Sequence, residues 1–184
     1  MKYVLVPIAE GTEEIEAVCI IDTLRRADIN VTVASVGNQH EICASHGTKI
    51  ISDTTINGCT TKLYDMIALP GGMPGATHLA NCEALIAMLH EQQNAGRSIA
   101  AICAAPAIVL KAHGPLKNTM ATCYPSMQDQ LDPMYCSKDG IVNENNVITS
   151  QGPGFALKFS LELVEHLLGH EKRKAVAKAM LVDE

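Results

Sequence analysis

The chain has 184 residues, of which 47% are hydrophobic and 18% are charged, and its formal net charge is −6. This length and composition predict one globular domain over residues 1–184, large enough to bury a core without disulfide bonds. The acidic balance, without a basic cluster interleaved with aromatic residues, argues against a nucleic-acid-binding protein. No apolar run approaches the roughly 20 residues that cross a bilayer, so we expect no interaction with a membrane.

The cysteines indicate the compartment. There are seven, an odd number with no CxxC pair, which fits a reducing compartment better than a disulfide framework. Met1 leads directly into a predicted strand, so no signal peptide is visible. We therefore expect a cytoplasmic protein.

In the first half of the chain, predicted strands alternate with a helix and a hairpin. In chain order the pattern predicts a strand at 2–8, a helix at 13–27, a strand at 30–36, a short antiparallel pair at 40–43 and 49–51, and a strand at 65–69. Thr12 is a suitable N-cap for the helix, because its hydroxyl can accept a backbone N–H. Proline and two glycines at 70–72 then end the last of these strands.

The second half continues the alternation. It predicts a helix at 82–94, a strand at 98–102, a helix at 104–112, a strand at 147–150, and helices at 155–168 and 171–181. Residues 113–140 are expected to be irregular, with a short strand near 120 and a short helix after 125. Such alternation is typical of a parallel sheet with helices on both faces. We therefore predict an α/β protein: a flavodoxin-like α/β/α sandwich with a mainly parallel central sheet.

Cys103 lies where the predicted strand at 98–102 gives way to a helix. Pro106 suits the first turn of that helix, and Ala104 keeps bulky side chains away from the backbone N–H groups before it. Those N–H groups and the helix dipole favour a thiolate, and the same groups can hold an oxyanion. The arrangement predicts a nucleophile elbow with cysteine as the nucleophile. The alternative is a small core residue, because free cysteine is often buried.

Glu16 stands one helical turn beyond Thr12, which can place its carboxyl group at the sheet edge near Cys103. A carboxyl group in a partly apolar pocket has a raised pKa and can exchange a proton with a nearby sulfur. We expect Glu13 and Glu14 to point outward or to complement the helix dipole. The alternative for Glu16 is a solvated position at the start of the helix.

Two glycine-containing segments follow strands at the same edge. Gly71 and Gly72 permit close backbone approach, and their N–H groups suit an oxyanion better than a phosphate, because the GxGxxG spacing and a Walker lysine are missing. No cofactor is therefore indicated. Gly152 and Pro153 form either a wall of the same pocket or an ordinary turn.

Four segments of the chain resemble the ThiJ/PfpI superfamily, in particular its parkinsonism-associated deglycase branch of the DJ-one type. They are EGTEEIEAV at 10–18, ALPGGMPGA at 68–76, AAICAAPA at 100–107 and TSQGPG at 149–154. The resemblance covers essentially the whole chain. It implies that Cys103 is the nucleophile, that the Glu16 carboxyl group bonds its sulfur, and that the N–H groups of Gly72 and Ala104 form an oxyanion hole. It also implies a homodimer with residues 13–27 near the interface.

The same resemblance implies glutathione-independent glyoxalase or protein deglycase activity on a small aldehyde, such as methylglyoxal, or on a glycated protein. Cys103 would add to the aldehyde to give a hemithioacetal, and Glu16 would move a proton between carbon and oxygen. The alternative function is an oxidative-stress sensor or redox-regulated chaperone, in which Cys103 is oxidised to a sulfinate and turnover is negligible. Both functions need the same thiolate, so the sequence does not separate them.

The chain departs from the family pattern near the expected pocket. Tyr124 stands where many eukaryotic members place a histidine, and a phenol with a pKa of about 10 is a poor base at neutral pH. Ala104 follows the cysteine in place of the histidine of the protease-like branches, so we expect no Cys–His triad and slow turnover. Arg26 is expected near the pocket, and His46 stands where relatives carry an arginine.

We expect no metal site, because neither group of spaced histidines converges on one ion. The groups are His40, Cys43 and His46 on a strand and turn, and His166 and His170 at a helix end. Among the thiols, Cys103 is expected to be the most acidic, with an acidity that depends on Glu16. Among the other thiols, Cys123 is the one expected to lie near the pocket. The remaining cysteines are taken as packing or surface residues: Cys19, Cys43, Cys59, Cys82 and Cys136.

Overall fold

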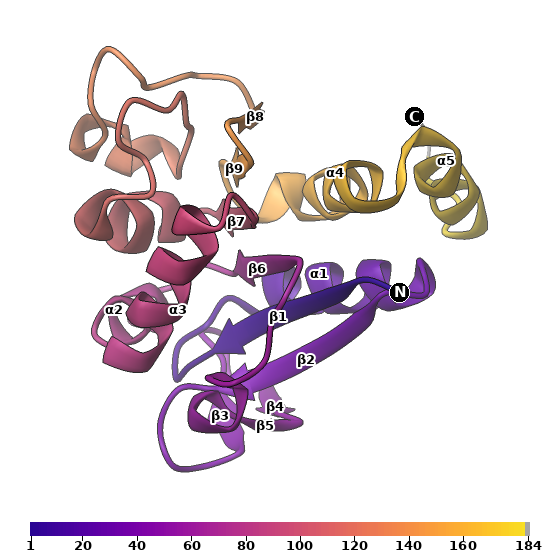
Figure 1. Cartoon of the computed structure of the whole chain (residues 1–184), viewed down its shortest axis with the longest axis horizontal. Coiled ribbons are helices and arrows are strands. Elements are labelled where there is room, and N and C mark those ends of the chain that lie inside the picture. Colours follow the sequence, from indigo (N-terminus) through magenta and orange to yellow (C-terminus); the bar gives the residue numbers. More distant parts are fainter. Residues whose placement is uncertain (183–184) are drawn as a thin grey trace.

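The computed structural model describes residues 1–182, within which a seven-stranded sheet has the spatial order β5–β2–β1–β6–β7–β9–β8 (Figure 1). Neighbouring strands are parallel except β8 and β9, which are antiparallel. The predicted α/β fold with a mainly parallel sheet is confirmed. The strands are β1 (Tyr3–Ile8), β2 (Asn30–Ser35), β5 (Thr54–Thr55), β6 (Met66–Leu69), β7 (Ser98–Ile102), β8 (Ile141–Glu144) and β9 (Val147–Ser150).

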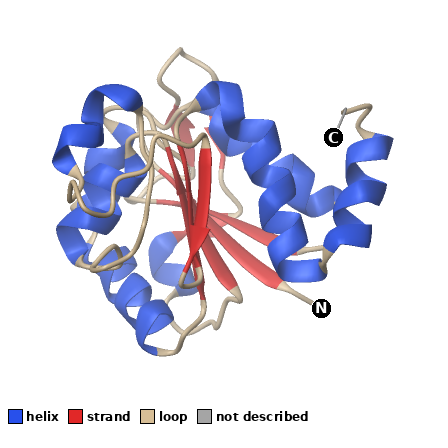
Figure 2. Ribbon diagram, turned by 90° about the horizontal axis from the view of Figure 1, so that it is seen from above, coloured by secondary structure: helices blue, strands red, loops and turns tan. Residues whose placement is uncertain are grey.

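Helices cover both faces of this sheet (Figure 2). On one face α1 and α4 pack together, and α5 packs against α4. On the other face lie α2, α3 and a π-helix at Pro106–Lys111. The predicted α/β/α sandwich is therefore confirmed. The α-helices are α1 (Glu14–Arg26), α2 (Gly75–Ala80), α3 (Glu83–Asn94), α4 (Ala156–Leu168) and α5 (His170–Ala179).

Alternate residues of β1 enter the two cores on either side of the sheet. Val4, Val6 and Ile8 pack towards α1 and α4, whereas Leu5 packs towards α3, and all four are fully buried. Side chains of a strand point alternately to opposite faces, so a strand covered on both sides needs an uninterrupted apolar run. The sequence signal for the central strands was strong for this reason.

The hairpin of β3 (Glu41–Cys43) and β4 (Lys49–Ile51) lies outside the main sheet and is antiparallel, as predicted. The strands β5 and β8 were not predicted. β5 has only two residues, and the last two residues of β8 are exposed, so neither leaves a periodic apolar pattern. The short strand expected near 120 is a single bridge between Ala121 and Cys136. The short helix expected after 125 is a 3₁₀-helix at Pro125–Gln130.

One prediction about a helix start is wrong. The N-cap of α1 is Glu13, because the Thr12 hydroxyl instead accepts the Ala9 N–H over 2.9 Å. The helix expected at 104–112 is present, and its central part, Pro106–Lys111, is a π-helix. The helix α2 was missed, because its six residues are mostly small and give no helical periodicity.

Among the described residues, no helix combines the length and apolar character that a membrane crossing requires. The longest α-helices, α1 and α4, have 13 residues each. Their buried residues lie on the faces that pack against the sheet and against each other.

Candidate active site

The carboxyl ends of adjoining strands bring the predicted site segments together. Ile102 of β7 pairs with Ser150 of β9, and Leu69 of β6 pairs with Ala101 of β7. β1 lies on the other side of β6. The loops that follow these strands therefore meet at one edge of the sheet, the edge where parallel α/β folds bind ligands.

Cys103 follows β7 with a φ of 65°, a left-handed conformation that is uncommon for a residue with a side chain. Its N–H donates to the Ser150 carbonyl over 2.9 Å, and its own carbonyl accepts the Tyr124 N–H over 2.8 Å. These bonds hold the strained backbone in place. The thiol consequently sits on a sharp turn between strand and helix, which is the geometry of a nucleophile elbow.

Gly71 allows Glu16 and Cys103 to approach each other. A Cβ atom at Gly71 would lie 2.6 Å from Cβ of Cys103 and 2.9 Å from Oε2 of Glu16, too close for any larger residue. The Gly71 N–H donates a 2.7 Å hydrogen bond to Oε2 of Glu16. The missing side chain and the backbone donor together place a carboxyl group beside the thiol.

Glu16 is fully buried at the start of α1. Burial raises the pKa of its carboxyl group to about 7, with a further upward contribution from the charge of Glu13, while the Gly71 N–H and the Cys103 thiol lower it. The second oxygen, Oε1, has no nitrogen or oxygen donor among the described residues. Such a carboxyl group can hold or release a proton near neutral pH.

The Cys103 thiol does not have the low pKa that the elbow suggested. Burial raises its pKa, the carboxylate of Glu16 raises it further, and the N–H groups of Gly72 and Ala104 lower it. Because the first two effects outweigh the third, the predicted acidity of Cys103 is wrong while Glu16 is ionised. The predicted influence of Glu16 on the pKa of Cys103 is present. An ionised Glu16 raises that pKa, whereas a protonated Glu16 does not.

Cys103 and Glu16 therefore titrate as a coupled pair. An ionised Glu16 repels a thiolate, whereas a protonated Glu16 carries no charge and can donate its O–H to the sulfur. Because the pKa of Glu16 is about 7 and that of Cys103 is raised well above its usual value, a single proton shared by the pair lies on the thiol, and the thiolate forms when that proton passes to the carboxyl group. In that state the N–H groups of Gly72 and Ala104 also bond the sulfur.

Tyr124 and Gly152 lie beside the elbow. A Cβ atom at Gly152 would lie 3.3 Å from Cδ2 of the Tyr124 ring, so the ring packs over this glycine. Tyr124 is 44% exposed, and its N–H bonds the Cys103 carbonyl. Pro153 is half-buried and begins a short 3₁₀-helix at Pro153–Phe155. The turn at 152–154 is thus connected to the elbow through Tyr124.

Arg26 does not lie at this edge within the chain, contrary to expectation. It occupies the last turn of α1, ten residues after Glu16, which corresponds to about 15 Å along a helix axis. Its Nε donates to Asp22 over 2.6 Å, and both side chains are about half exposed. The helix that begins at the site therefore carries Arg26 away from it.

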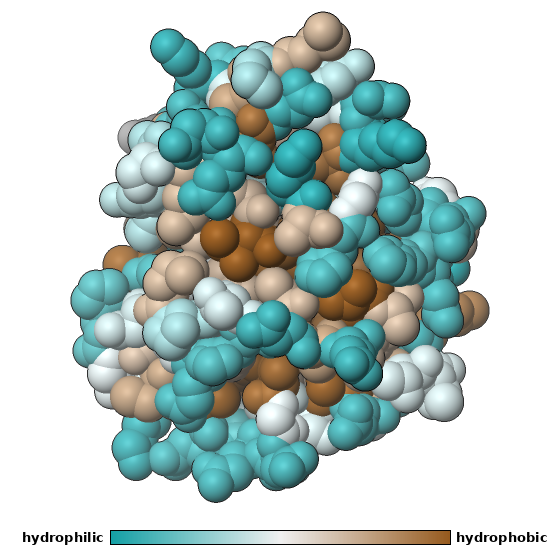
Figure 3. Space-filling view, turned by 90° about the vertical axis from the view of Figure 1, so that its left-hand side faces the viewer, coloured by the Kyte–Doolittle hydropathy of each residue, from teal (hydrophilic) through white to brown (hydrophobic). Residues whose placement is uncertain are grey.

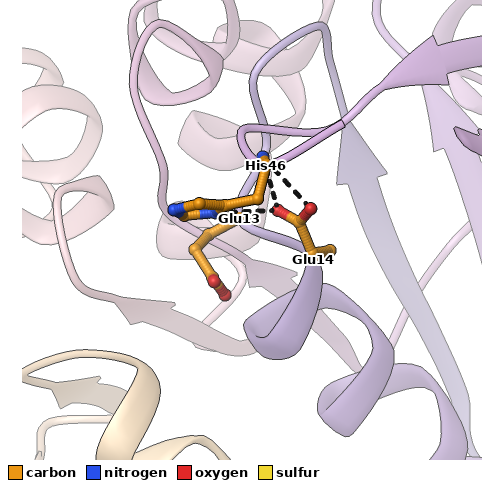
Figure 4. Close-up of side chains that lie close together, drawn as sticks. All are labelled: Glu13, Glu14 and His46. Atoms are coloured by element: carbon orange, nitrogen blue, oxygen red, sulfur yellow. Dashed lines mark hydrogen bonds and ion pairs between the residues drawn. The ribbon is translucent and has the colours of Figure 1, made fainter. Parts of the chain in front are cut away.

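Glu13, Glu14 and His46 gather where the start of α1 meets the turn between β3 and β4 (Figure 4). Within residues 1–182, these three form the one group whose possible metal-ligand atoms lie within 4.8 Å of one another. The Glu14 carboxylate already accepts hydrogen bonds from the Ser45 hydroxyl and the His46 N–H. Its role in this structure is therefore to hold the turn. The predicted histidine groups contribute only His46 to this cluster.

Glu13 takes the second of the two places that the sequence allowed it. It does not point outward: it is only 6% exposed, and as the N-cap of α1 its Oε2 accepts the Glu16 N–H over 2.7 Å, which complements the helix dipole. The signal was present in the spacing, because an N-cap side chain bonds the backbone N–H three residues later. The sequence analysis preferred Thr12 as the N-cap, because threonine is the better N-cap by residue type.

The other thiols differ in exposure. Cys123 is fully buried next to Tyr124, and burial raises its pKa to about 12. Cys59 is also buried, and Cys43 is exposed. The remaining ones, Cys19, Cys82 and Cys136, are half-buried. These positions agree with packing or surface roles for the residues that were assigned them.

Comparison with known proteins gives consistent matches. A family model described as the DJ-1/PfpI family matches residues 2–166. Protein DJ-1 homolog B of Arabidopsis thaliana is 44% identical over 179 residues, which are 97% of this chain and 41% of that protein. This chain thus spans less than half the length of that relative. Protein dj-1beta of Drosophila melanogaster is 39% identical, and the match covers 98% of this chain and 97% of that protein.

Solved structures of other proteins have the same fold as this chain. A structure described as Toxoplasma gondii DJ-1, oxidized, matches with a TM-score of 0.99 and 42% identity, over 100% of both chains. The structure of Drosophila melanogaster DJ-1beta matches with a TM-score of 0.95 and 38% identity, over 100% of this chain and 99% of that one. The backbone arrangement described above is therefore shared with these proteins over the full chain.

Proposed function

Because this chain belongs to the DJ-1/PfpI family, we propose that it acts on reactive carbonyl compounds through Cys103. The family predicted from four sequence motifs is confirmed. A Caenorhabditis elegans relative named glutathione-independent glyoxalase DJR-1.2 is 36% identical over 93% of this chain and 91% of its own length. For the present chain the proposed reaction is the conversion of methylglyoxal to lactate, or the removal of a methylglyoxal adduct from a glycated protein.

The observation that carries the proposal is the buried contact between the Glu16 carboxyl group and the Cys103 thiol. A thiol alone would add to an aldehyde reversibly, and the hemithioacetal would revert to the starting compounds. A carboxyl group whose pKa is raised to about 7 by burial can both give and take a proton at neutral pH. The two groups together suit a reaction that forms a covalent adduct and then moves a proton within it.

In the first proposed step the Cys103 thiol passes its proton to Glu16, the sulfur bonds to the aldehyde carbon of methylglyoxal, and the carbonyl π electrons move to the oxygen. The N–H groups of Gly72 and Ala104, which lower the pKa of the thiol, are the proposed donors to this oxyanion. Protonated Glu16 then gives its proton to the oxygen. The product of this step is a neutral hemithioacetal and an ionised Glu16.

In the second step the Glu16 carboxylate removes the hydrogen on the former aldehyde carbon as a proton and returns it to the neighbouring ketone carbon, while the hydroxyl proton of the hemithioacetal passes to the former ketone oxygen. The first carbon is thereby oxidised and the second reduced, so no external oxidant or cofactor is required. The result is a thioester of lactate on Cys103. Water cleaves the carbon–sulfur bond, which releases lactate and restores the thiol.

Turnover of methylglyoxal with lactate measured as product tests this proposal. We expect no lactate from Cys103→Ala, and a loss of about 100-fold or more in kcat for Glu16→Gln, since a positioned proton-transfer group contributes at least this much. Cys43→Ala serves as the matched control, because Cys43 is exposed and lies on β3. Equal rates for the wild type and Cys103→Ala would exclude the proposed reaction.

A second candidate function is redox sensing or redox-regulated chaperone activity, in which peroxide oxidises Cys103 to a sulfinate. It is supported by the same carboxyl group, because a protonated Glu16 can donate a hydrogen bond to a sulfinate oxygen. The Toxoplasma relative was solved in a form described as oxidized. Mass spectrometry after mild peroxide treatment separates the two functions: selective oxidation of Cys103 without methylglyoxal turnover supports the sensor.

The proposed assembly is a homodimer formed through α1 and β4. Ile15 and Val18 of α1 are about half exposed, and Ile51 of β4 is 71% exposed. A groove between these elements is lined by Val18, Ile21 and Ile50, with the exposed ion pair of Arg25 and Asp53 also on its wall. An apolar surface with a polar rim is typical of a protein interface.

The remaining proposals concern organisation and location. Residues 1–184 are proposed to be a single ThiJ/PfpI-like domain, since two cores flank one sheet over the described residues. A cytoplasmic location is proposed from the seven cysteines, which are all free. Reduced thiols are stable in that compartment.

A further inference from the structure

Glu13 belongs to a closed ring of hydrogen bonds that joins the start of α1 to the glycine turn of the site. The Glu13 N–H donates to the Gly71 carbonyl over 3.0 Å. The Gly71 N–H donates to Oε2 of Glu16 over 2.7 Å, and the Glu16 N–H donates to Oε2 of Glu13 over 2.7 Å. Each residue in the ring therefore gives one bond and accepts one.

We propose that Glu13 is a positioning residue of the Cys103 site, acting through Glu16 by closing this ring. The proposal rests on the roles assigned above to Glu16 and Cys103. Without the Glu13 side chain the ring opens at the Glu16 N–H, and the carboxyl group of Glu16 loses one of the two connections that tie it to the turn at Gly71. Gly72, the next residue of that turn, supplies an N–H to the sulfur.

The packing around the turn leaves little room for another arrangement. Gly72 has a φ of 89°, and a Cβ atom there would lie 2.4 Å from the Glu13 nitrogen. The backbone of Glu13 thus packs directly against Gly72, whose N–H is the proposed oxyanion donor. A small displacement of residue 13 would move this donor relative to Cys103, and catalytic geometry tolerates little displacement.

The charge of Glu13 adds a second effect on the same target. Glu13 is only 6% exposed, and its carboxylate disfavours ionisation of Glu16, whose pKa is raised mainly by burial. Capping a helix does not require this residue, because serine, aspartate and asparagine are the better N-caps. A buried glutamate at this position therefore holds Glu16 in place and also favours its protonated form.

The adjoining Glu14 provides a matched contrast. Its carboxylate bonds Ser45 and His46 in the turn between β3 and β4, and it is not part of the ring. Burial raises the pKa of Glu14, but hydrogen bonds from its own backbone N–H and from that turn outweigh this effect and lower the pKa to about 2. Its charge does not figure among the influences on Glu16. The neighbouring residues Glu13 and Glu14 thus bond to different parts of the structure: Glu13 to the ring with Gly71, and Glu14 to the turn between β3 and β4.

Carboxyl ¹³C NMR of the intact chain tests the charge effect, with the Glu16 signal assigned by its loss in Glu16→Gln. Glu13→Gln keeps an acceptor for the Glu16 N–H but removes the charge. We expect the titration midpoint of Glu16 to fall by about one pH unit, as for removal of a nearby like charge in a partly buried site. Glu13→Asp keeps both the charge and a good N-cap, and should restore a midpoint near that of the wild type.

The amide resonance of Gly71 tests the ring itself. In the wild type this N–H bonds the Glu16 carboxylate, so its chemical shift should follow the titration of Glu16. Glu13→Ala removes the side-chain acceptor, and we expect the pH-dependent shift of the Gly71 signal to become smaller, because the remaining bond to Glu16 is less firmly held. Should Glu13→Ala fail to fold, the Glu13→Gln titration decides the proposal on its own.

An unchanged Glu16 midpoint in Glu13→Gln overturns the proposal, and so does an equal shift in Glu14→Gln. A Gly71 signal that follows Glu16 in Glu13→Ala with the same pH-dependent shift as in the wild type overturns the positioning role. None of these measurements requires substrate turnover. A protein that fails to convert methylglyoxal but shows the expected shifts would lack the proposed function and retain the proposed role of Glu13.

Discussion

Gly71 and Cys103 are positions where the backbone restricts the residue type as much as the chemistry does. Cys103 has a positive φ that few residues with side chains adopt, and it is held there by bonds to Ser150 and Tyr124. Gly71 has no room for a Cβ atom between Cys103 and Glu16. The distance between the thiol and the carboxyl group therefore depends on an absent side chain.

Gly71→Ala should separate Glu16 from Cys103. The added methyl group would meet Cβ of Cys103, Oε2 of Glu16 and the Ile102 carbonyl at 2.6 to 2.9 Å. Overpacking of this kind costs about 1 to 3 kcal/mol of unfolding free energy. We expect that loss in urea denaturation, together with a changed pH profile of Cys103 alkylation by iodoacetamide.

Gly154→Ala is the matched control for this substitution. A Cβ atom at Gly154 would meet nothing within 4 Å, and its backbone is not in the left-handed region. We expect its stability and alkylation profile to match the wild type. If Gly71→Ala behaved in the same way as Gly154→Ala, the close packing of the site would be contradicted.

Glu16 should make the stability of the protein fall as pH rises. Its pKa is 4.5 without the fold, and burial raises it to about 7, so the folded protein binds more protons between these values. The contribution is complete below pH 4.5 and is lost as pH passes 7. It amounts to roughly 3 kcal/mol, since each tenfold change in proton affinity is worth about 1.4 kcal/mol.

Urea unfolding at pH 5 and pH 8 measures this contribution. Glu16→Gln is uncharged at both values and provides the reference. We expect the wild type to lose stability relative to Glu16→Gln between the two pH values. The same pH dependence in both proteins would show that Glu16 is not a buried titrating group.

At the scale of elements, β7 is tied at both ends. Its carboxyl end leads into the elbow, and its first residue, Ser98, bonds Nε2 of His166 on α4 over 2.7 Å. His166 is half-buried, and burial lowers its pKa. The strand that presents Cys103 is therefore fastened to a helix on one face by a polar contact with a half-buried imidazole, whose neutral form is favoured by burial.

This contact should weaken under mildly acidic conditions. Because the folded pKa of His166 lies below its usual value of 6.5, the unfolded chain binds more protons below that pH. The stabilising contribution is present above pH 6.5 and is lost as pH falls through the folded pKa. Unfolding of the wild type and His166→Gln at pH 7.5 and pH 5.5 checks this: the stability difference between them should shrink at the lower pH. A constant difference would contradict it.

At the scale of the whole molecule, apolar surface is distributed unequally. On the face that carries α2 and α3, apolar spots are separated by polar side chains (Figure 3). On α1 and β4, by contrast, Val18 and Ile51 are exposed along one groove, and Ile15 is exposed on the same helix. Large apolar patches on soluble proteins usually mark interaction sites. The start of α1 also carries Glu16, so an interface there would lie close to the site.

Light scattering after size-exclusion chromatography should therefore give twice the mass of the 19.7 kDa chain. Val18→Asp combined with Ile51→Glu should shift the protein to a monomer, because two buried charges without partners are costly at an interface. Leu63→Asp, at a position 73% exposed outside this groove, should leave the mass unchanged. A wild-type monomer at micromolar concentration would refute the proposed dimer.

The sequence by itself determined the family, the alternation of strands and helices, and the positions of the central strands. These follow from local signals: continuous apolar runs, glycine and proline punctuation, and four motifs in order. Short strands such as β5 and β8 escaped, because a few half-exposed residues carry no periodicity. The position of Cys103 at the end of β7 was also readable, since a strand that ends at a small-residue turn has a local pattern.

Only the tertiary structure decided the electrostatics of the site. The low pKa expected for Cys103 rested on N–H groups close to it in the chain. Its pKa is instead raised by burial and by the charge of Glu16, which lies 87 residues earlier in the chain (103 − 16). The burial of Glu13 likewise depends on how α1 meets the turn at Gly71, whereas the distance of Arg26 from the site follows from its place ten residues after Glu16 in one helix. A pKa is set by everything within a few ångströms, whatever its distance in sequence.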